Sequence, residues 1–133
     1  MAIFGLGAYY DGTTDMSDDF ISNGLACIGW KERHGPAFHN VMRHIKVGDI
    51  VYLKSHPPTI GLIIKAVGIV TDDRVSTKKN LGRSCIKVRW IWNGNQVIGK
   101  IDDKYNVRNV TLYEEYSPVV QKRVLKLLFS GLH

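Results

Sequence analysis

The chain has 133 residues, the usual size of one globular domain and too short for two ordinary ones. Its apolar share of 44% allows a real core, and with 23% charged residues this argues against a disordered chain. Lys and Arg number 18 and Asp and Glu number 12, so the net charge is +6, which favours a polyanionic partner. The sequence therefore predicts a single domain over residues 1–133.

The sequence also predicts the cellular compartment and the redox state of the two cysteines. The start, Met1–Gly5, has no basic leader, and the longest apolar run, around Thr59–Val70, is interrupted by Lys65 and is too short to cross a bilayer. Cys27 and Cys85 are too few for a disulfide framework or a thiolate zinc site. We therefore expect a cytoplasmic protein, no membrane partner, and two reduced thiols that pack as small hydrophobes.

Strand and turn patterns dominate the first part of the chain. A strand is expected over Ile3–Tyr10, ended by Asp11-Gly12, and a second over Leu25–Trp30. Between them, residues 13–23 are polar and turn-rich, with Phe20 and Ile21 as anchors into the core. Residues 31–35 are expected to form a charged loop.

The clearest helical pattern follows this loop. Four apolar side chains fall at i, i+3, i+4 and i+7, which is one face of a helix: Phe38, Val41, Met42 and Ile45. Gly35-Pro36 comes before them, and proline suits the first helical turn. The opposite face, with His39, Asn40, Arg43 and His44, is expected to be solvated.

The rest of the chain is expected to be mostly strands with one closing helix. Strands are predicted over Ile50–Ser55, Ile60–Val70, Ser84–Trp92, Gln96–Ile101 and Val110–Tyr113. Residues 71–81 are expected to be an exposed loop, and Asn93-Gly94 a type I′ hairpin turn. Ser117-Pro118 should cap a helix whose buried stripe is Val120, Val124, Leu127 and Leu128. About six strands joined mainly by short turns predict an α+β fold, a small mixed and mainly antiparallel β-barrel with flanking helices.

A search for catalytic or metal-binding patterns finds none that is complete. Gly5-Leu6-Gly7 lacks the third glycine of a dinucleotide site. His34, His39 and His44 are five residues apart, so on a helix successive ones diverge by about 140° and cannot share one face. We expect no metal and no cofactor, and the sequence favours a binding domain over an enzyme.

Aromatic and cationic residues occur together at three places instead. Tyr9 and Tyr10 close the first strand, Trp30 stands beside Lys31 and Arg33, and Lys54 and Ser55 end a later strand. Aromatic faces stack on bases while Lys and Arg hold phosphates, so these seven residues are candidates for binding nucleic acid. The alternatives are that one of the two tyrosines belongs to the core edge and that Trp30 only caps the barrel.

The strand over Ser84–Trp92 alternates with period two. Lys87 and Arg89 point one way, as possible phosphate contacts or as an ordinary solvated sheet face. Trp90 and Trp92 point the other way, and we expect both in the core on one shared face.

Three stretches of the chain resemble EVE-like domains of the PUA-like superfamily. They are Asn23–Trp30, Ile45–Ser55 with its K-x-G-D turn Lys46–Asp49, and Lys65–Val70, which ends in a G-x-V segment. The resemblance covers roughly residues 1–75, and the Arg-Asn pair of many EVE domains is absent before the turn. It implies a compact β-barrel with a concave surface for DNA or RNA and an aromatic pocket for a flipped, often methylated base. That pocket would lie between Tyr9 and Tyr10, the loop at Trp30, and Lys54-Ser55.

Three functions remain open at this point. The first is a reader of DNA or RNA that recognises a modified base, working alone or beside a separately encoded effector protein. The second is a module that binds a partner protein or a small ligand. The third is an enzyme acting on RNA or DNA. A steep salt dependence of binding to oligonucleotides separates the first from the second.

Overall fold

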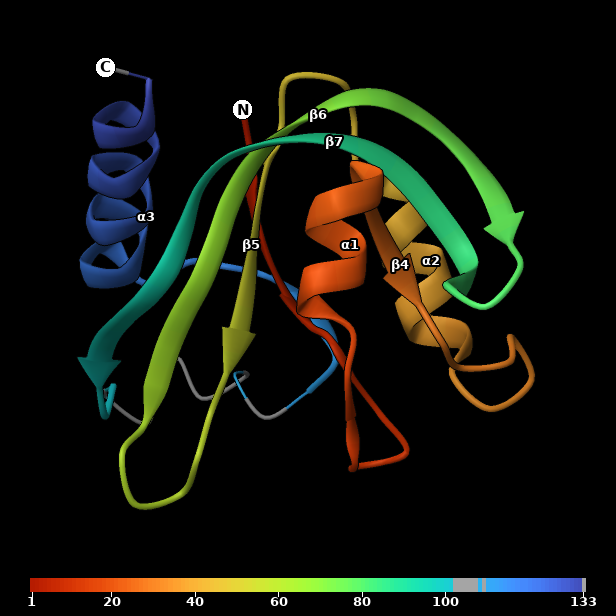
Figure 1. Cartoon of the computed structure of the whole chain (residues 1–133), viewed down its shortest axis with the longest axis horizontal. Coiled ribbons are helices and arrows are strands. Elements are labelled where there is room, and N and C mark those ends of the chain that lie inside the picture. Colours follow the sequence, from red (N-terminus) through yellow and green to blue (C-terminus); the bar gives the residue numbers. More distant parts are fainter. Residues whose placement is uncertain (102–107, 109, 133) are drawn as a thin grey trace.

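A curved six-stranded sheet forms the centre of the computed structural model, which describes residues 1–101, 108 and 110–132. In spatial order the strands are β4 (Leu25–Ile28), β7 (Gly82–Gly99), β6 (Leu62–Lys78), β5 (Ile50–Ser55), β1 (Ile3–Gly7) and β8 (Leu112–Glu114). β1 and β5 are parallel, and every other neighbouring pair is antiparallel. The sheet curls into a half-barrel (Figure 1), which confirms the predicted α+β, mainly antiparallel fold.

In the described part of the chain, three helices cover the sheet: α1 (Ser17–Asn23), α2 (Pro36–His44) and α3 (Pro118–Gly131). In Figure 1, α1 and α2 lie toward one end of the curved sheet and α3 toward the other. The caps follow the sequence: Pro36 stands at the start of α2, and the Ser117 hydroxyl accepts a hydrogen bond from the Val120 N–H at 3.5 Å. Within the described ranges, no helix is long and apolar enough to span a membrane.

The two faces of the sheet bury two separate clusters of side chains. Along β1 and β5, successive residues alternate between them. Phe4, Leu6, Val51 and Leu53 join the cluster under α1 and α2, while Ile3, Ile50 and Tyr52 join the one under α3. A strand buried on both faces carries apolar residues on both, which is why the sequence of β5 begins with a continuous run of apolar residues.

The first predicted strand is broken in the structure. β1 ends at Gly7, and the next residues form β2 (Tyr9–Tyr10), which pairs with β3 (Thr14–Asp15) in a separate two-stranded sheet. Asp11 and Gly12 both take positive φ, 54° and 68°, in the turn between them. The segment expected to be only turns also contains α1. Phe20 is fully buried from this helix, as predicted, and Ile21 is partly buried.

The largest error of the prediction concerns β6 and β7. The expected loop over residues 71–81 is strand down to Lys78, and the hairpin turns at residues 79–81, where Asn80 takes φ 66°. Asn93-Gly94 is not a turn, because β7 runs continuously past it and Asn93 pairs with Ala66. The backbone ladder holds these polar residues in strands, since ladder hydrogen bonds do not require apolar side chains.

A bulge in β7 separates the two tryptophans. Val67 pairs with Trp92 and Gly68 with Trp90, so β7 has one extra residue, Ile91, between them. Trp90 packs on the cluster under α1 and α2, and Trp92 on the cluster under α3. The prediction of one shared face was therefore wrong, although both side chains are partly buried.

The two cysteines are joined, which corrects the prediction of free thiols. Cys27 in β4 and Cys85 in β7 stand directly opposite each other in the antiparallel register, with Cα atoms 4.1 Å apart, and form a disulfide. Residues directly opposite each other on antiparallel strands bring their side chains close together. Their sequence separation of 58 conceals this proximity in the sequence.

Candidate functional site

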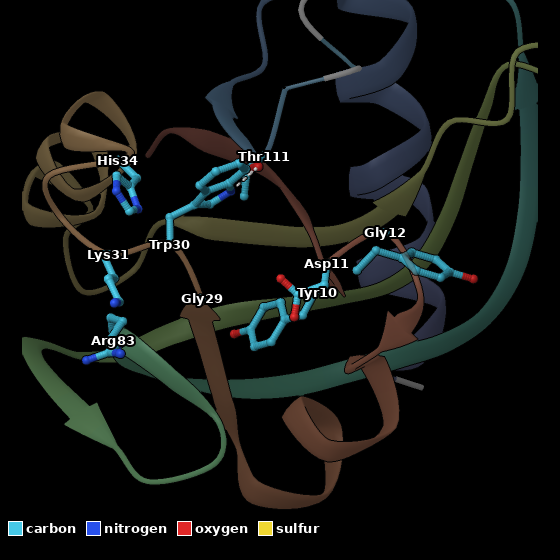
Figure 2. A pocket seen from close by; sticks show the side chains of 10 residues that line it. Tyr10, Asp11, Gly12, Gly29, Trp30, Lys31, His34, Arg83 and Thr111 are labelled. Atoms are coloured by element: carbon cyan, nitrogen blue, oxygen red, sulfur yellow. Dashed lines mark hydrogen bonds between the residues drawn. The ribbon is translucent and has the colours of Figure 1, made fainter.

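A cavity of about 630 Å³ opens where β2 faces the loop that follows β4 (Figure 2). Cavities of this size are typical of small-molecule sites. Aromatic, acidic and basic residues from distant parts of the chain line it: Tyr9, Tyr10, Asp11, Gly12, Gly29, Trp30, Lys31, His34, Arg83 and Thr111. We call this space the Trp30 cavity.

The indole of Trp30 is fixed in place but remains accessible. Its Nε1–H donates a hydrogen bond to the Thr111 hydroxyl at 3.0 Å, and its ring packs against Phe38 of α2 with the ring centroids 6.2 Å apart. Even so, 48% of the residue is exposed. Trp30 thus presents a pre-positioned aromatic surface to the cavity instead of capping the barrel from inside.

A buried histidine holds the backbone of this loop. His39 was predicted to be solvated, but it is only 2% exposed. Its Nε2 lies 2.6 Å from the Trp30 carbonyl oxygen and its Nδ1 lies 2.6 Å from the Ser84 hydroxyl. A carbonyl can only accept, so Nε2 carries a proton and donates. Helical periodicity gave no sign of this role, because the partners lie on other elements.

The His39→Leu protein is expected to lose about 1–3 kcal/mol of unfolding free energy, because Ser84 and the Trp30 carbonyl lose their buried partner. Its affinity for a ligand of the Trp30 cavity should fall as well, since the loop is no longer fixed. Urea unfolding and a binding titration measure the two effects. The matched control is His44→Leu on the exposed side of α2, for which we expect a change within about 0.5 kcal/mol. Equal effects of the two substitutions would contradict this role.

The two neighbouring tyrosines have different environments. Tyr10 is packed edge-on against Phe20 with ring centroids 6.1 Å apart, and its hydroxyl donates to the Leu81 carbonyl at 2.5 Å. Its ring lies so close to Gly29 that a Cβ there would come within 2.9 Å of it. Burial raises the pKa of Tyr10, which keeps the phenol neutral. Tyr10 is thus a wall of the cavity at the core edge.

Tyr9, in contrast, is 52% exposed. The Lys65 ammonium lies 5.4 Å from the centroid of its ring and also pairs with Asp15 at 2.7 Å. The Tyr9 ring is therefore the more accessible aromatic surface of the pair.

Charged groups of both signs border the cavity. Figure 2 shows Lys31 and Arg83 on one side of it, with Asp11 across from them. Arg83 lies in β7 directly after the β6–β7 hairpin turn, and the extension of this hairpin brings it to the cavity. The cavity thus combines aromatic surfaces with cations on one side and one carboxylate acceptor on the other.

A second hollow of about 450 Å³ adjoins the first and shares Tyr9 and Thr111 with it. Its other lining residues are Gly7, Lys54, Ser55, His56, Pro57 and Val110. We call this space the Lys54 hollow. The predicted single pocket is therefore two adjoining spaces, with Tyr10, Trp30 and Lys31 in one and Lys54 and Ser55 in the other.

Lys54 is buried, with 7% of the residue exposed. Its Nζ donates to the Arg108 carbonyl at 2.5 Å and lies 5.6 Å from the centroid of the Tyr113 ring. Burial lowers the pKa of Lys54 to about 8. The pKa of His56 is lowered too, first by burial and then by the charges of Lys54 and Arg108.

Three predicted residues lie away from both spaces. Arg33 lines a third hollow of about 390 Å³, together with Lys31, Glu32, His39, Arg83 and Ser84. Lys87 and Arg89 are exposed on β7 and line none of these three spaces. Their contact with phosphate stays a prediction.

Comparison with known proteins adds one finding about the fold. No family model matches the chain, and no curated protein matches it. Among solved structures, the YTH domain of the Zygosaccharomyces rouxii MRB1 protein, crystallised in complex with N6-methyladenosine RNA, has a similar fold with a TM-score of 0.51. The match covers 96% of this chain and 84% of that one at 14% sequence identity. The likeness is to a YTH/PUA-like fold, and the narrower EVE-like assignment stays a prediction.

Proposed function

We propose that this protein binds RNA and recognises a modified base, such as a methylated one, in the Trp30 cavity. The observation that carries the proposal is the exposed indole of Trp30, held by Thr111 and by the His39 contact to its backbone. An aromatic surface that is rigid before binding loses little conformational entropy when a base stacks on it. The likeness to a domain crystallised with N6-methyladenosine RNA supports the same function.

The polar residues of the cavity suit a nucleotide. Lys31 and Arg83 stand where the phosphates of a strand entering the cavity can be neutralised, in keeping with the net charge of +6. The Asp11 carboxylate can accept hydrogen bonds from the N–H groups of a base edge. A base methyl group buried against Trp30 adds roughly 1 kcal/mol by its apolar area.

The proposal favours single-stranded RNA as the partner. A base must leave its stack to reach such a cavity, which costs a few kcal/mol in a duplex and less in a single strand. Stacking on the aromatic rings and hydrogen bonds to the base edge offset that cost.

Fluorescence-anisotropy titrations with a matched set of oligonucleotides test the proposal. The set comprises RNA and DNA, single- and double-stranded, each with and without a methylated adenine or cytosine in the same sequence. We expect the tightest binding for single-stranded RNA with a methylated base. Equal, weak binding to all members that disappears with added salt would reject base recognition and leave only a generic basic surface.

A further inference from the structure

We infer that the Lys54 hollow binds a phosphate group next to the base held in the Trp30 cavity. This inference rests on the proposed function and adds to it a second, separate subsite. Neither the net charge nor the exposed cations identify this subsite, because Lys54 is buried.

The buried ammonium of Lys54 has little to compensate its charge. Its contacts are the Arg108 carbonyl and the face of the Tyr113 ring. In the part of the chain that the structure describes, no carboxylate forms an ion pair with it. The buried carboxylate of Glu115 is engaged by Arg108 and Tyr52. A buried charge without a counter-ion is unfavourable, so an anion in the adjoining hollow would stabilise it.

The remaining lining of the hollow supplies further donors. The Ser55 hydroxyl and the His56 ring come from the same strand end as Lys54. The Thr111 oxygen accepts from Trp30, which leaves its own hydroxyl hydrogen free to donate. Gly7 adds no side chain to fill the space, and a Cβ at this position would lie 3.5 Å from Lys54 Nζ. Several donors around one cationic centre match the acceptor oxygens of a phosphate.

The position of the hollow relates this phosphate to the bound base. Tyr9 and Thr111 line both spaces, so they form the partition between them. Thr111 also holds the indole on which the base would stack. A nucleotide whose base enters the Trp30 cavity therefore has its sugar at the partition and a phosphate within reach of the Lys54 hollow.

The charge state of Lys54 gives the subsite a pH dependence. The pKa of Lys54 in the unliganded protein is about 8. A bound phosphate favours the charged form of Lys54, so the phosphate group's contribution to the binding affinity falls as the pH rises from about 7 to about 9. Among the described residues, the other titratable groups that face Lys54 do not change charge in this pH range. Burial raises the pKa of Tyr113. Burial and then the charges of Lys54 and Arg108 lower the pKa of His56. Arg108 is paired with Glu115.

Calorimetric titration with small ligands tests the subsite. The ligands are N6-methyladenosine, its 5′- and 3′-monophosphates, and a dinucleotide with the methylated base. We expect at least one phosphorylated form to bind about tenfold tighter than the nucleoside, as for hydrogen bonds to charged groups. Lys54→Met should remove this gain and leave nucleoside binding unchanged, whereas Lys126→Met, on the exposed side of α3, should leave both unchanged.

The outcomes separate the two proposals. If the nucleoside binds and phosphate adds nothing, the subsite is overturned and the base cavity stands. If none of the ligands binds, the base cavity fails. A gain with the dinucleotide but with neither monophosphate assigns the site to a strand phosphate instead of a free nucleotide. If Lys54→Met does not fold, the same titrations of the unmodified protein at pH 7 and pH 9 provide the test. An affinity gain of the monophosphate over the nucleoside that is equal at the two pH values would refute the assignment to Lys54.

Discussion

The Trp30→Ala protein is expected to bind methylated RNA about 5- to 150-fold more weakly than the unmodified protein, since stacking of one base contributes about 1–3 kcal/mol. Its preference for methylated over plain RNA should be lost as well, because the methyl group no longer has an apolar surface to cover. The fold should survive, since 48% of Trp30 is solvent-exposed and its ring packs against Phe38 at a centroid distance of 6.2 Å without entering the core. Anisotropy titrations with a matched methylated and plain RNA pair measure both effects.

Two further variants show whether the aromatic surface at this place is responsible. Trp30→Phe keeps a ring but loses the hydrogen bond to Thr111, so we expect it to retain most of the preference for methylated RNA. Tyr116→Ala removes an aromatic side chain that is 63% exposed and lines neither space, and it should leave binding unchanged. An unaltered preference in Trp30→Ala would remove the basis of the proposed site.

Reduction of the Cys27–Cys85 disulfide is expected to lower the free energy of unfolding by about 4 kcal/mol. The bond closes a loop of 58 residues, and the loss of chain entropy in the unfolded state scales with the logarithm of that length. Urea unfolding with and without reductant measures the difference. The bond joins β4 to β7, next to Ser84 and the Trp30 loop, so reduction should also weaken ligand binding.

The control for this prediction is the double variant Cys27→Ala, Cys85→Ala, whose stability should not respond to reductant. Thiol titration of the protein unfolded without reductant tests the bond itself. We expect no reactive thiols, whereas two would restore the interpretation that both cysteines are free.

Elements whose pattern lies in their own residues were predictable from the sequence. The apolar stripe of α2, the run of β5 and the Ser117-Pro118 start of α3 each reflect burial of that segment alone. The extension of β6 to Lys78 was not predictable in this way, because its polar residues are held by pairing with β7. The bulge at Ile91 likewise depends on register between strands and leaves no sign in the alternation of side chains.

The same distinction between patterns within one segment and contacts between distant segments applies to the candidate site. Residue type alone pointed to Trp30, Tyr9 and Lys31, since exposed aromatic rings beside cations have few structural uses. Thr111 and His39 became visible only through hydrogen bonds across the fold, to partners between 9 and 81 residues away in the sequence. Arg83 became visible only as part of the cavity lining. Lys54 was a candidate because of its position, but its burial and its separate hollow could not be deduced from an apolar strand that ends in a lysine.

The most direct test of the account is the indole N–H signal of Trp30 in a ¹H–¹⁵N correlation spectrum during titration with N6-methyladenosine. Trp30→Phe assigns the signal by its disappearance. Trp90 serves as an internal control, because its Nε1–H is turned inward to the carbonyls of Phe20 and Leu25. If a base stacks on Trp30, its signal shifts saturably, more with N6-methyladenosine than with adenosine, while the Trp90 signal stays in place. A Trp30 signal that does not move, or that moves equally with both nucleosides, would contradict recognition of a modified base in this cavity.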